Sequence, residues 1–315
     1  MKQVKFITGL MAFGVVSLFA GCGEKENEMT KVTLNEVAHS IFYAPQYVAL
    51  ENGYFTQEGL DLDLVTGYGA DKTMAAVISG EAQIGFMGAE ASVYAYLEGA
   101  NDPVINFAQG TQRAGNFLVA REEMADFQWS DLKGKEVLGG RKGGMPEMVF
   151  EYILKENGLD PAKDLSIDQS IDFGSTAAAF SGGKGEFTVE FEPAATTLEK
   201  NGDGFVVASL GVDSGYVPYT SYSAKTSYVE KHPEIIQAFT DGLQKGVDYV
   251  NSHTAEEIAK VIQPQFKEND LDTITRIVER YQSQDTWKEN LVFEKESFEL
   301  LQDILESAGE LEKRA

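Results

Sequence analysis

Short strands alternate with short helices along most of this chain, and this alternation constrains the fold more than any other feature. Apolar runs of strand length occur at 32–37, 60–67, 82–88, 103–109, 116–121, 135–140, 165–171, 186–191 and 204–211. Helical spacing of apolar residues lies between them, for example at 44–55, 70–80, 90–99 and 145–158. Strands that alternate with helices of about ten residues are typical of βαβ units and parallel sheets. The sequence therefore predicts an α/β protein.

The last third of the chain has a different pattern. Helical periodicity is continuous over 232–251, 254–266, 270–282 and 294–309. Thr254 followed by Glu257 has the spacing of a capping box, and Asp270 before Thr273 also favours a helix start. Two βα halves followed by a helical tail predict a two-lobed protein. The strand-like connections at about 112–121 and 214–224 are the expected hinge.

The N-terminus has the pattern of an export signal. Lys2 and Lys5 precede an apolar run at 7–20, which is shorter than the ~20 residues that span a bilayer. The run ends in Gly21-Cys22, so the segment resembles a bacterial lipoprotein signal, although Phe19 stands where that class usually has a smaller aliphatic residue. In that class Cys22 would be lipidated and become the mature N-terminus. We therefore expect a signal peptide at 1–21 and a flexible tether at 22–30. An ordinary signal followed by a free cysteine is the alternative.

Charge narrows the range of partners. The formal net charge is −24 at pH 7, and removal of the signal makes it more negative still. Such a chain repels phosphate backbones, so no nucleic-acid partner is expected. It also repels anionic lipid, so attachment to a membrane would depend on the lipid on Cys22, the only cysteine.

The residues of familiar catalytic sites are missing. The three histidines, His39, His232 and His253, are not spaced as metal ligands with each other or with the single cysteine. No nucleophile elbow is present, and the glycine-rich run at 139–144 matches neither a dinucleotide fingerprint nor a phosphate-binding loop. We therefore expect no catalytic residue, no metal, no cofactor and no enzyme activity.

Residues that suit ligand binding instead follow several predicted strands. In open α/β sheets ligands collect beyond the carboxyl ends of the strands, where helix N-termini offer free N–H groups. In the first half the candidates are His39, Phe42, Tyr43, Gly69, Gly88, Ala89 and Glu90. Phe42 and Tyr43 could stack on a flat ligand, or Phe42 could simply pack under its turn. The small residues and Glu90 could contact ligand or could be ordinary turn residues.

The second half and the connections add further candidates. They are Arg113, Gly144, Met145, Glu192 and Tyr219. Glu192 could accept hydrogen bonds from an amino or ring N–H, or it could be a carboxylate favoured by the helix dipole. Arg141 and Lys142 could bind an anion or form a solvated basic loop, and another strand end lies at 172–175. Together these residues offer binding chemistry without catalytic chemistry.

The order of five segments carries a family resemblance. They are 44–65, 77–92, 131–144, 191–211 and 217–239. In this order they resemble the solute-binding proteins of ATP-driven importers with the type-II periplasmic-binding-protein fold. The more specific resemblance is to the branch that binds thiamine pyrimidine precursors, alkanesulfonates, taurine and nitrate. Pyrimidine synthases that share the fold carry a cysteine-rich motif, which this sequence lacks.

The resemblance implies an organisation and a role. It implies two lobes with mixed central sheets, lobe 1 at 31–115 with 215–315 returning to it, and lobe 2 at 116–214. It also implies a monomer that captures a small solute between the lobes and delivers it to a membrane permease and its ATPase, from the extracytoplasmic face. Carboxylates and aromatic residues favour a flat N-heterocycle such as a thiamine pyrimidine precursor. An alkanesulfonate, taurine or nitrate is the alternative, and a secreted enzyme or a sensor lipoprotein on the same fold stays open.

Overall fold

The structure is a computed structural model, and it describes Met1 and residues 29–140, 142–171 and 174–315. Cys22, most of the tether, Arg141, Asp172 and Phe173 therefore lie outside the described residues. The strands are β1 (Thr30–Glu36), β2 (Leu60–Thr66), β3 (Ile84–Met87), β4 (Val104–Thr111), β5 (Phe117–Ala120), β6 (Glu136–Leu138), β7 (Ser166–Asp168), β8 (Phe187–Glu190), β9 (Phe205–Ser209) and β10 (Thr220–Lys225). The helices up to β10 are η1 (Ile41–Tyr43), α1 (Ala44–Glu51), α2 (Tyr54–Gln57), α3 (Ala70–Ser79), α4 (Glu90–Leu97), η2 (Trp129–Leu132), α5 (Met145–Glu156), α6 (Thr176–Ser181), α7 (Ala194–Asn201) and α8 (Leu210–Asp213). The tail contains α9 (Thr226–Lys231), α10 (Pro233–Ser252), α11 (Ala255–Ile262), η3 (Gln263–Gln265), α12 (Leu271–Ser283) and α13 (Lys295–Ala308).

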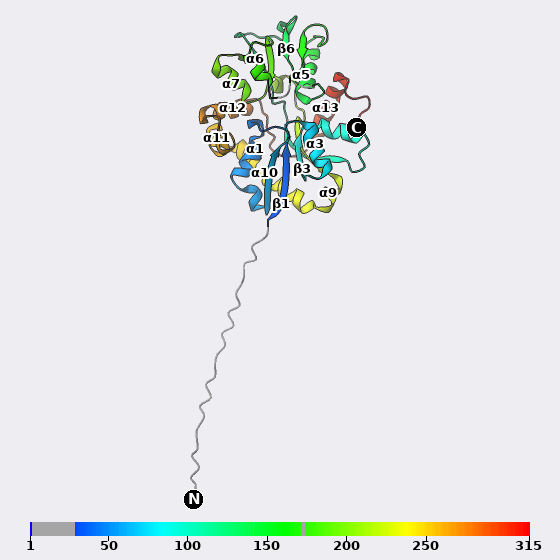
Figure 1. The fold of residues 1–315 in the computed structure, drawn as a ribbon, viewed down its shortest axis with the longest axis vertical. Helices are drawn as coiled ribbons and strands as arrows, with labels where there is room; N and C mark the ends of the chain where they lie inside the picture. The colour runs from blue at the N-terminus through cyan, green and yellow to red at the C-terminus, as the bar shows by residue number, and fades with distance from the viewer. Residues whose placement is uncertain (2–28, 141, 172–173) are drawn as a thin grey trace.

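Two mixed sheets of five strands each form the centres of two halves of the molecule (Figure 1). The first sheet has the order β2-β1-β3-β10-β4, with β1 parallel to β2 and β3 and with β10 antiparallel to β3 and β4. The second has the order β7-β6-β8-β5-β9, with β6 parallel to β7 and β8 and with β5 antiparallel to β8 and β9. The predicted α/β class with mixed central sheets is therefore confirmed.

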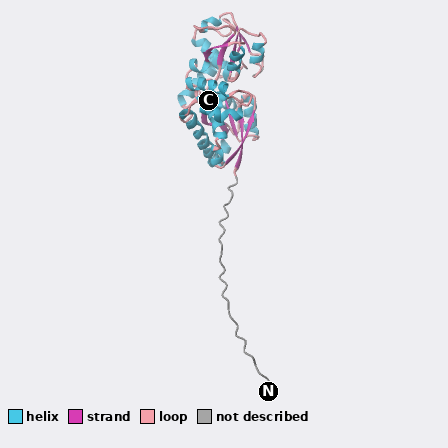
Figure 2. Cartoon of the chain, turned by 90° about the vertical axis from the view of Figure 1, so that its left-hand side faces the viewer, coloured by secondary structure: helices cyan, strands magenta, loops and turns pink. Residues whose placement is uncertain are grey.

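The chain passes between the two sheets twice, and these passages define the geometry of the site. We call residues 112–116, between β4 and β5, the first crossover, and residues 210–219, between β9 and β10, the second crossover. The side view in Figure 2 shows the strands in two groups, one above the other, with helices around both. The antiparallel strands β5 and β10 are the ones that receive the chain after each crossover.

The predicted tail is helical, and it contacts both halves. Thr254 and Glu257 form the expected capping box, and the Asp270 side chain accepts a hydrogen bond from the Thr273 N–H. α10 packs on α1 and α2, whereas α13 packs on α5 of the second half. Gly246 permits the close approach of α10 and α1, because a Cβ there would lie 2.2 Å from the carbonyl oxygen of Pro45. The division of the chain into two lobes stays a prediction. It did not include the contact of α13 with the second half.

The region after β9 differs from the sequence-based expectation. A strand was expected to reach residue 211, but Leu210–Asp213 forms the short helix α8. The Ser209 side chain accepts a hydrogen bond from the Val212 N–H and so favours a helix start at this point. The turn of α8 redirects the chain into the second crossover. Among the helices of the described residues, none has the length and apolar character needed to cross a bilayer.

Candidate functional site

The two halves meet at a junction formed by strand ends, helix starts and the two crossovers. Ser40 Oγ, before η1, donates a hydrogen bond of 2.8 Å to the carbonyl oxygen of Glu192 after β8. The Tyr94 hydroxyl of α4 donates to the carbonyl oxygen of Gly143, at 3.4 Å, before α5. These contacts link the carboxyl-end edges of both sheets, where ligands collect in α/β folds. The junction is therefore the candidate site.

Aromatic residues fill the centre of this junction. Phe42 is fully buried, and its ring lies 5.9 Å from Phe191, 5.8 Å from Tyr219 and 5.2 Å from Tyr281, measured between centroids. Gly115 of the first crossover fits under this ring, since a Cβ there would lie 2.7 Å from its carbon atoms. In this structure Phe42 therefore packs between the two halves.

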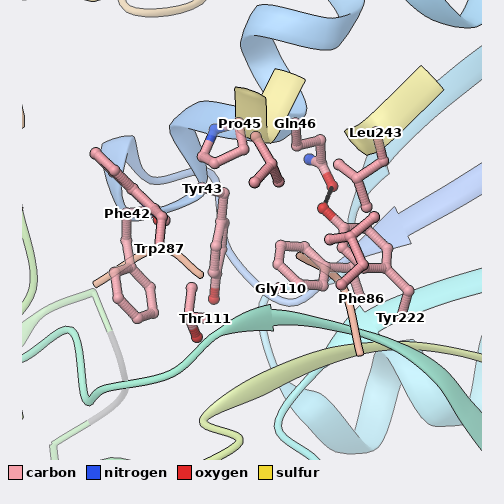
Figure 3. Close-up of a pocket in the computed structure, with 12 residues that line it drawn as sticks. Phe42, Tyr43, Pro45, Gln46, Phe86, Gly110, Thr111, Tyr222, Leu243 and Trp287 are labelled. Carbon is pink, nitrogen blue, oxygen red and sulfur yellow. Dashed lines mark hydrogen bonds between the residues drawn. The ribbon is translucent and has the colours of Figure 1, made fainter. Parts of the chain in front are cut away.

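A cavity of about 10 Å³ lies beside these rings, on the side of the first sheet (Figure 3). Tyr43, Gln46 and Thr111 line it, together with Tyr222, whose hydroxyl donates to Gln46 Oε1 at 3.1 Å. Such a volume is close to the lower limit for one water molecule. An organic solute therefore needs the halves to separate before it can enter this part of the junction.

Glu90 lies with two tyrosines at the start of α4. Ala89 is the N-cap residue, and the Glu90 carboxylate covers Gly88, where a Cβ would lie 2.0 Å from Oε2. Glu90 is 3% exposed. Burial raises the pKa of Tyr43 and Tyr219 well above the ordinary value, and the charge of Glu90 adds to both increases. The structure thus brings together Tyr43, Gly88, Ala89, Glu90 and Tyr219 from the predicted set.

A second buried carboxylate lies across the junction at the start of α5. Gly144 is the N-cap residue and Met145 is buried. The sequence also suggests Glu147 as an acceptor carboxylate of the cleft, and in the structure it accepts hydrogen bonds from the Gly143 N–H at 2.9 Å and from Gln169 Nε2 at 2.6 Å. Burial raises the pKa of Glu147 to about 7. Its position at a helix start following a glycine run was the available signal.

Glu192 is already occupied by protein donors. Thr196 donates to both of its carboxylate oxygens, at 2.9 Å each, and Arg280 Nη1 lies 2.5 Å from Oε1. Burial raises the pKa of Glu192, while Arg280 and Thr196 lower it. A solute N–H would compete with these donors for the carboxylate oxygens. The residue lies at the junction, as expected, but its observed role is to bind α12.

His39 and Gly69 both lie in the first half, and His39 also contacts the tail. His39 Nε2 donates to the carbonyl oxygen of Gln265 at 2.9 Å, and Nδ1 lies 2.8 Å from Glu36 Oε1. The ring also stacks on Phe266. Burial lowers the pKa of His39, but Glu36 and Gln265 outweigh this effect, and the net change is an increase. Gly69 has φ +146° at the start of α3. His39 therefore fastens the turn after β1 to the tail.

Glu36 is a buried centre that the sequence analysis missed. Its fully buried carboxylate accepts hydrogen bonds from Gln46 Nε2 and the Tyr47 hydroxyl, both at 2.8 Å, and from Thr66 Oγ1 at 3.1 Å. The sequence signal that could have revealed Glu36 is an acidic residue at the end of an apolar strand. The network fixes the turn from β1 into α1 that positions Phe42 and Tyr43.

Arg113 faces the second crossover. Its Nη1 donates to the carbonyl oxygen of Gly211 at 3.0 Å, and its guanidinium lies 4.1 Å from the centroid of the Tyr216 ring. Its Nε is buried and has no hydrogen-bond partner within the described part of the chain. Lys142 is exposed. No group of three or more His, Cys, Asp or Glu residues that could hold a metal occurs in the described ranges.

Comparison with known proteins gives the family. The NMT1/THI5 like family matches residues 41–257, and the chain belongs to this family. YtlA of Bacillus subtilis (strain 168), whose name describes it as a binding protein, is 47% identical over 294 residues, which cover 93% of this chain and 88% of YtlA.

Solved structures confirm the fold. The ligand-binding component of an ABC-type import system from Staphylococcus aureus, with zinc bound, matches with a TM-score of 0.73 at 15% identity, over 91% of this chain and 94% of that one. The alkanesulfonate-binding protein SsuA from Xanthomonas axonopodis pv. citri, bound to MOPS, matches with a TM-score of 0.71 at 16% identity, over 91% and 95%. The chain therefore has the periplasmic-binding-protein fold. These proteins and YtlA are described as binding proteins. This agrees with the expectation that the chain binds a ligand and is not an enzyme.

Proposed function

We propose that this chain is the extracytoplasmic solute-binding subunit of an ATP-driven importer. It captures a small organic solute at the junction and presents it to a membrane permease that works with an ATPase. Membership of the NMT1/THI5 like family and the fold shared with an import-system component support this role. So does the architecture, because two sheets joined by two crossovers can open and close like a hinge.

The best candidate solute is a flat N-heterocycle with N–H donors, such as a pyrimidine precursor of thiamine. The observation that carries this proposal is the pair of buried carboxylates, Glu90 and Glu147, at helix starts on opposite sides of the junction. Carboxylates accept hydrogen bonds from amino and ring N–H groups, and the neighbouring Tyr43 and Tyr219 offer aromatic faces. Arg280, by contrast, is paired with Glu192 and Glu199.

An organosulfonate is the second candidate. The buried Nε of Arg113, which lacks a partner among the described residues, is the observation that favours an anion. A guanidinium can bind two oxygens of an anion at once. The fold similarity to sulfonate-binding proteins, at 16% identity, is compatible with this solute without selecting it.

The test is a thermal-shift series on the mature chain carrying Cys22→Ser. The panel contains the amino-substituted hydroxymethylpyrimidine precursor of thiamine, thiamine, cytosine, taurine, an alkanesulfonate and nitrate. A ligand at 100 times its Kd stabilises by about 2.7 kcal/mol, which shifts Tm by a few degrees. The proposal predicts a shift with the aminopyrimidine and none with taurine. A shift with sulfonates alone would replace the first candidate by the second.

Membrane attachment through a lipid on Cys22 belongs to the same proposal. The strongly negative charge makes direct adsorption to anionic lipid unfavourable, so the anchor would have to be covalent. Labelling of cells with a radioactive fatty acid tests this point. The proposal predicts incorporation into the wild-type chain and none into the Cys22→Ala variant. We also expect the Cys22→Ala variant to be released into the medium or periplasm.

A further inference from the structure

Asn116 connects the two crossovers at the junction. It is the last residue of the first crossover, directly before β5, and it is 1% exposed. Its carbonyl oxygen accepts a hydrogen bond of 3.0 Å from the N–H of Leu210, where the second crossover begins. Its side-chain oxygen accepts a hydrogen bond of 2.5 Å from the hydroxyl of Tyr219, where the second crossover ends. Hydrogen bonds to the second crossover thus fix both the backbone and the side chain of Asn116.

The amide nitrogen of the same side chain has no such partner. Nδ2 of Asn116 is buried, and within the described part of the chain no acceptor bonds to it. A buried donor without an acceptor costs about 1–3 kcal/mol, so native proteins seldom keep one without a reason. Asn106 provides the contrast: its Nδ2 donates to Ser92 and its Oδ1 accepts from Ser221 and Ser223.

The surroundings of this amide are those of the candidate site. Tyr219, which holds the amide, packs edge-on against Phe42 with 5.8 Å between centroids, and its ring lies 6.2 Å from Phe191. The charge of Glu90 acts on Tyr219. The free donor therefore lies between the two halves, on the crossovers, close to the residues at which a solute would be enclosed.

We propose that Nδ2 of Asn116 donates a hydrogen bond to an acceptor atom of the bound solute, and that Tyr219 positions the amide for this contact. The assignment rests on the proposed function and adds an element of specificity. Glu90 accepts hydrogen bonds and Asn116 donates one, so the solute presents a donor and an acceptor together. A ring nitrogen or carbonyl oxygen next to an amino group has this pattern. The oxygens of an alkanesulfonate without an amino group could accept from Asn116 but could not donate to Glu90.

The binding test compares three variants of the mature Cys22→Ser chain by calorimetric titration. The probes are the aminopyrimidine precursor and ethanesulfonate, a sulfonate without an amino group. Asn116→Ala is expected to weaken binding of the aminopyrimidine roughly tenfold or more, because the solute acceptor is left buried and unpaired. Tyr219→Phe should weaken it by a smaller factor, since the amide remains but is less well fixed. Asn106→Ala is the matched control and should leave the affinity unchanged. Equal affinities for Asn116→Ala and wild type would overturn the assignment.

A second test needs no ligand. The double variant Asn116→Ala/Tyr219→Phe removes both partners of the internal hydrogen bond together with the unpaired donor. Removing both partners is nearly neutral when nothing else depends on them. The expected Tm therefore equals or exceeds that of wild type, whereas Asn106→Ala lowers it by several degrees. A loss in the double variant as large as in Asn106→Ala would show that Asn116 is a structural residue.

The binding test and the ligand-free test distinguish a failure of the proposed solute classes from a failure of the role assigned to Asn116. If the wild-type chain binds neither probe, the proposed solute classes are wrong, while the ligand-free comparison still decides the assignment of Asn116. If wild type binds ethanesulfonate and not the aminopyrimidine, and Asn116→Ala abolishes this binding, the donor role holds and the heterocycle proposal fails. If wild type binds the aminopyrimidine and the Asn116 variant does so equally well, only the assignment fails.

Discussion

The guanidinium of Arg280 lies 2.5 Å from the carboxylate of Glu192 and joins the tail to the second half of the molecule. The Glu192 side chain is completely buried, and that of Arg280 is 18% exposed. Arg280 also contacts Glu199 in α7, at 2.8 Å. Because α12 packs on η1 of the first half as well, this ion pair holds the junction in the arrangement seen here. Opening of the halves must either carry α12 along or break the pair.

Replacing the arginine tests how much this pair stabilises the fold. Arg280→Met leaves the buried carboxylate of Glu192 without its cation, and such losses cost about 3–5 kcal/mol in the free energy of unfolding. The cost should be smaller at pH 5 than at pH 8, because protonation of Glu192 relieves the buried charge. Urea denaturation at both pH values measures it. Arg276→Met is the control, since Arg276 is half exposed and should contribute ~1 kcal/mol or less. Equal losses in the two variants would contradict this view of the pair.

Glu190 predicts a pH dependence of stability. Burial raises the pKa of its carboxyl, at the end of β8, from 4.5 to about 7. The unfolded chain releases this proton near its ordinary pKa while the folded chain retains it, so stability falls as pH rises from about 4.5 to 7. Glu190→Gln should remove that fall and gain roughly 3 kcal/mol over wild type at pH 8.

A pH series of urea denaturation measures this effect. Glu186→Gln is the control. Lys135 holds the pKa of the exposed Glu186 below its usual value, so its small contribution is lost at acid pH, in the opposite direction. If the stability of Glu190→Gln falls between pH 4.5 and 8 as much as that of wild type, the buried carboxyl of Glu190 is not the cause of this fall.

Gly88 tests the position of Glu90. A methyl group at residue 88 would lie 2.0 Å from Oε2 of Glu90, so Gly88→Ala must displace this carboxylate. The backbone of Gly88 lies outside the left-handed region, so the variant should fold, with a loss of about 1–3 kcal/mol from overpacking around the buried carboxylate. Affinity for the aminopyrimidine is expected to drop about tenfold by calorimetry. Gly182→Ala, at the end of α6, is the matched control. Unchanged affinity in Gly88→Ala would remove Glu90 from the site.

The fold follows from local sequence signals to a large extent. Alternation of strand and helix patterns placed the elements of both sheets, and the Thr254 and Asp270 caps marked helix starts that the structure contains. The antiparallel insertion of β5 and β10 could not be read from these patterns, because it depends on where the crossovers return the chain. Nor could the packing of α13 on α5, since a charged amphipathic helix carries no mark of its partner.

The site was less accessible to sequence reasoning. Glycines and aromatic residues after strands marked the edge at which the two halves meet, and Tyr43, Gly88, Glu90 and Tyr219 come together there. The internal partners of buried carboxylates were not visible, so the sequence left Glu192 between solute contact and a helix-start carboxylate and did not reveal its pairing with Arg280, far away in sequence. Asn116 was overlooked because a single asparagine before a strand has no pattern. Its importance depends on a missing partner, which only three-dimensional structure can show.

The central claim is that a solute is enclosed between the two halves, and a distance measurement across them tests it most directly. With Cys22 replaced, cysteines introduced at exposed Glu98 and Lys163 carry spin labels on the first and second halves. Pulsed electron resonance then gives the distribution of distances with and without saturating aminopyrimidine. The account predicts a broad or longer distribution in the free chain and a single narrow one with the solute. An identical distribution in both samples, at a concentration where calorimetry shows binding, would contradict capture by closure of the halves.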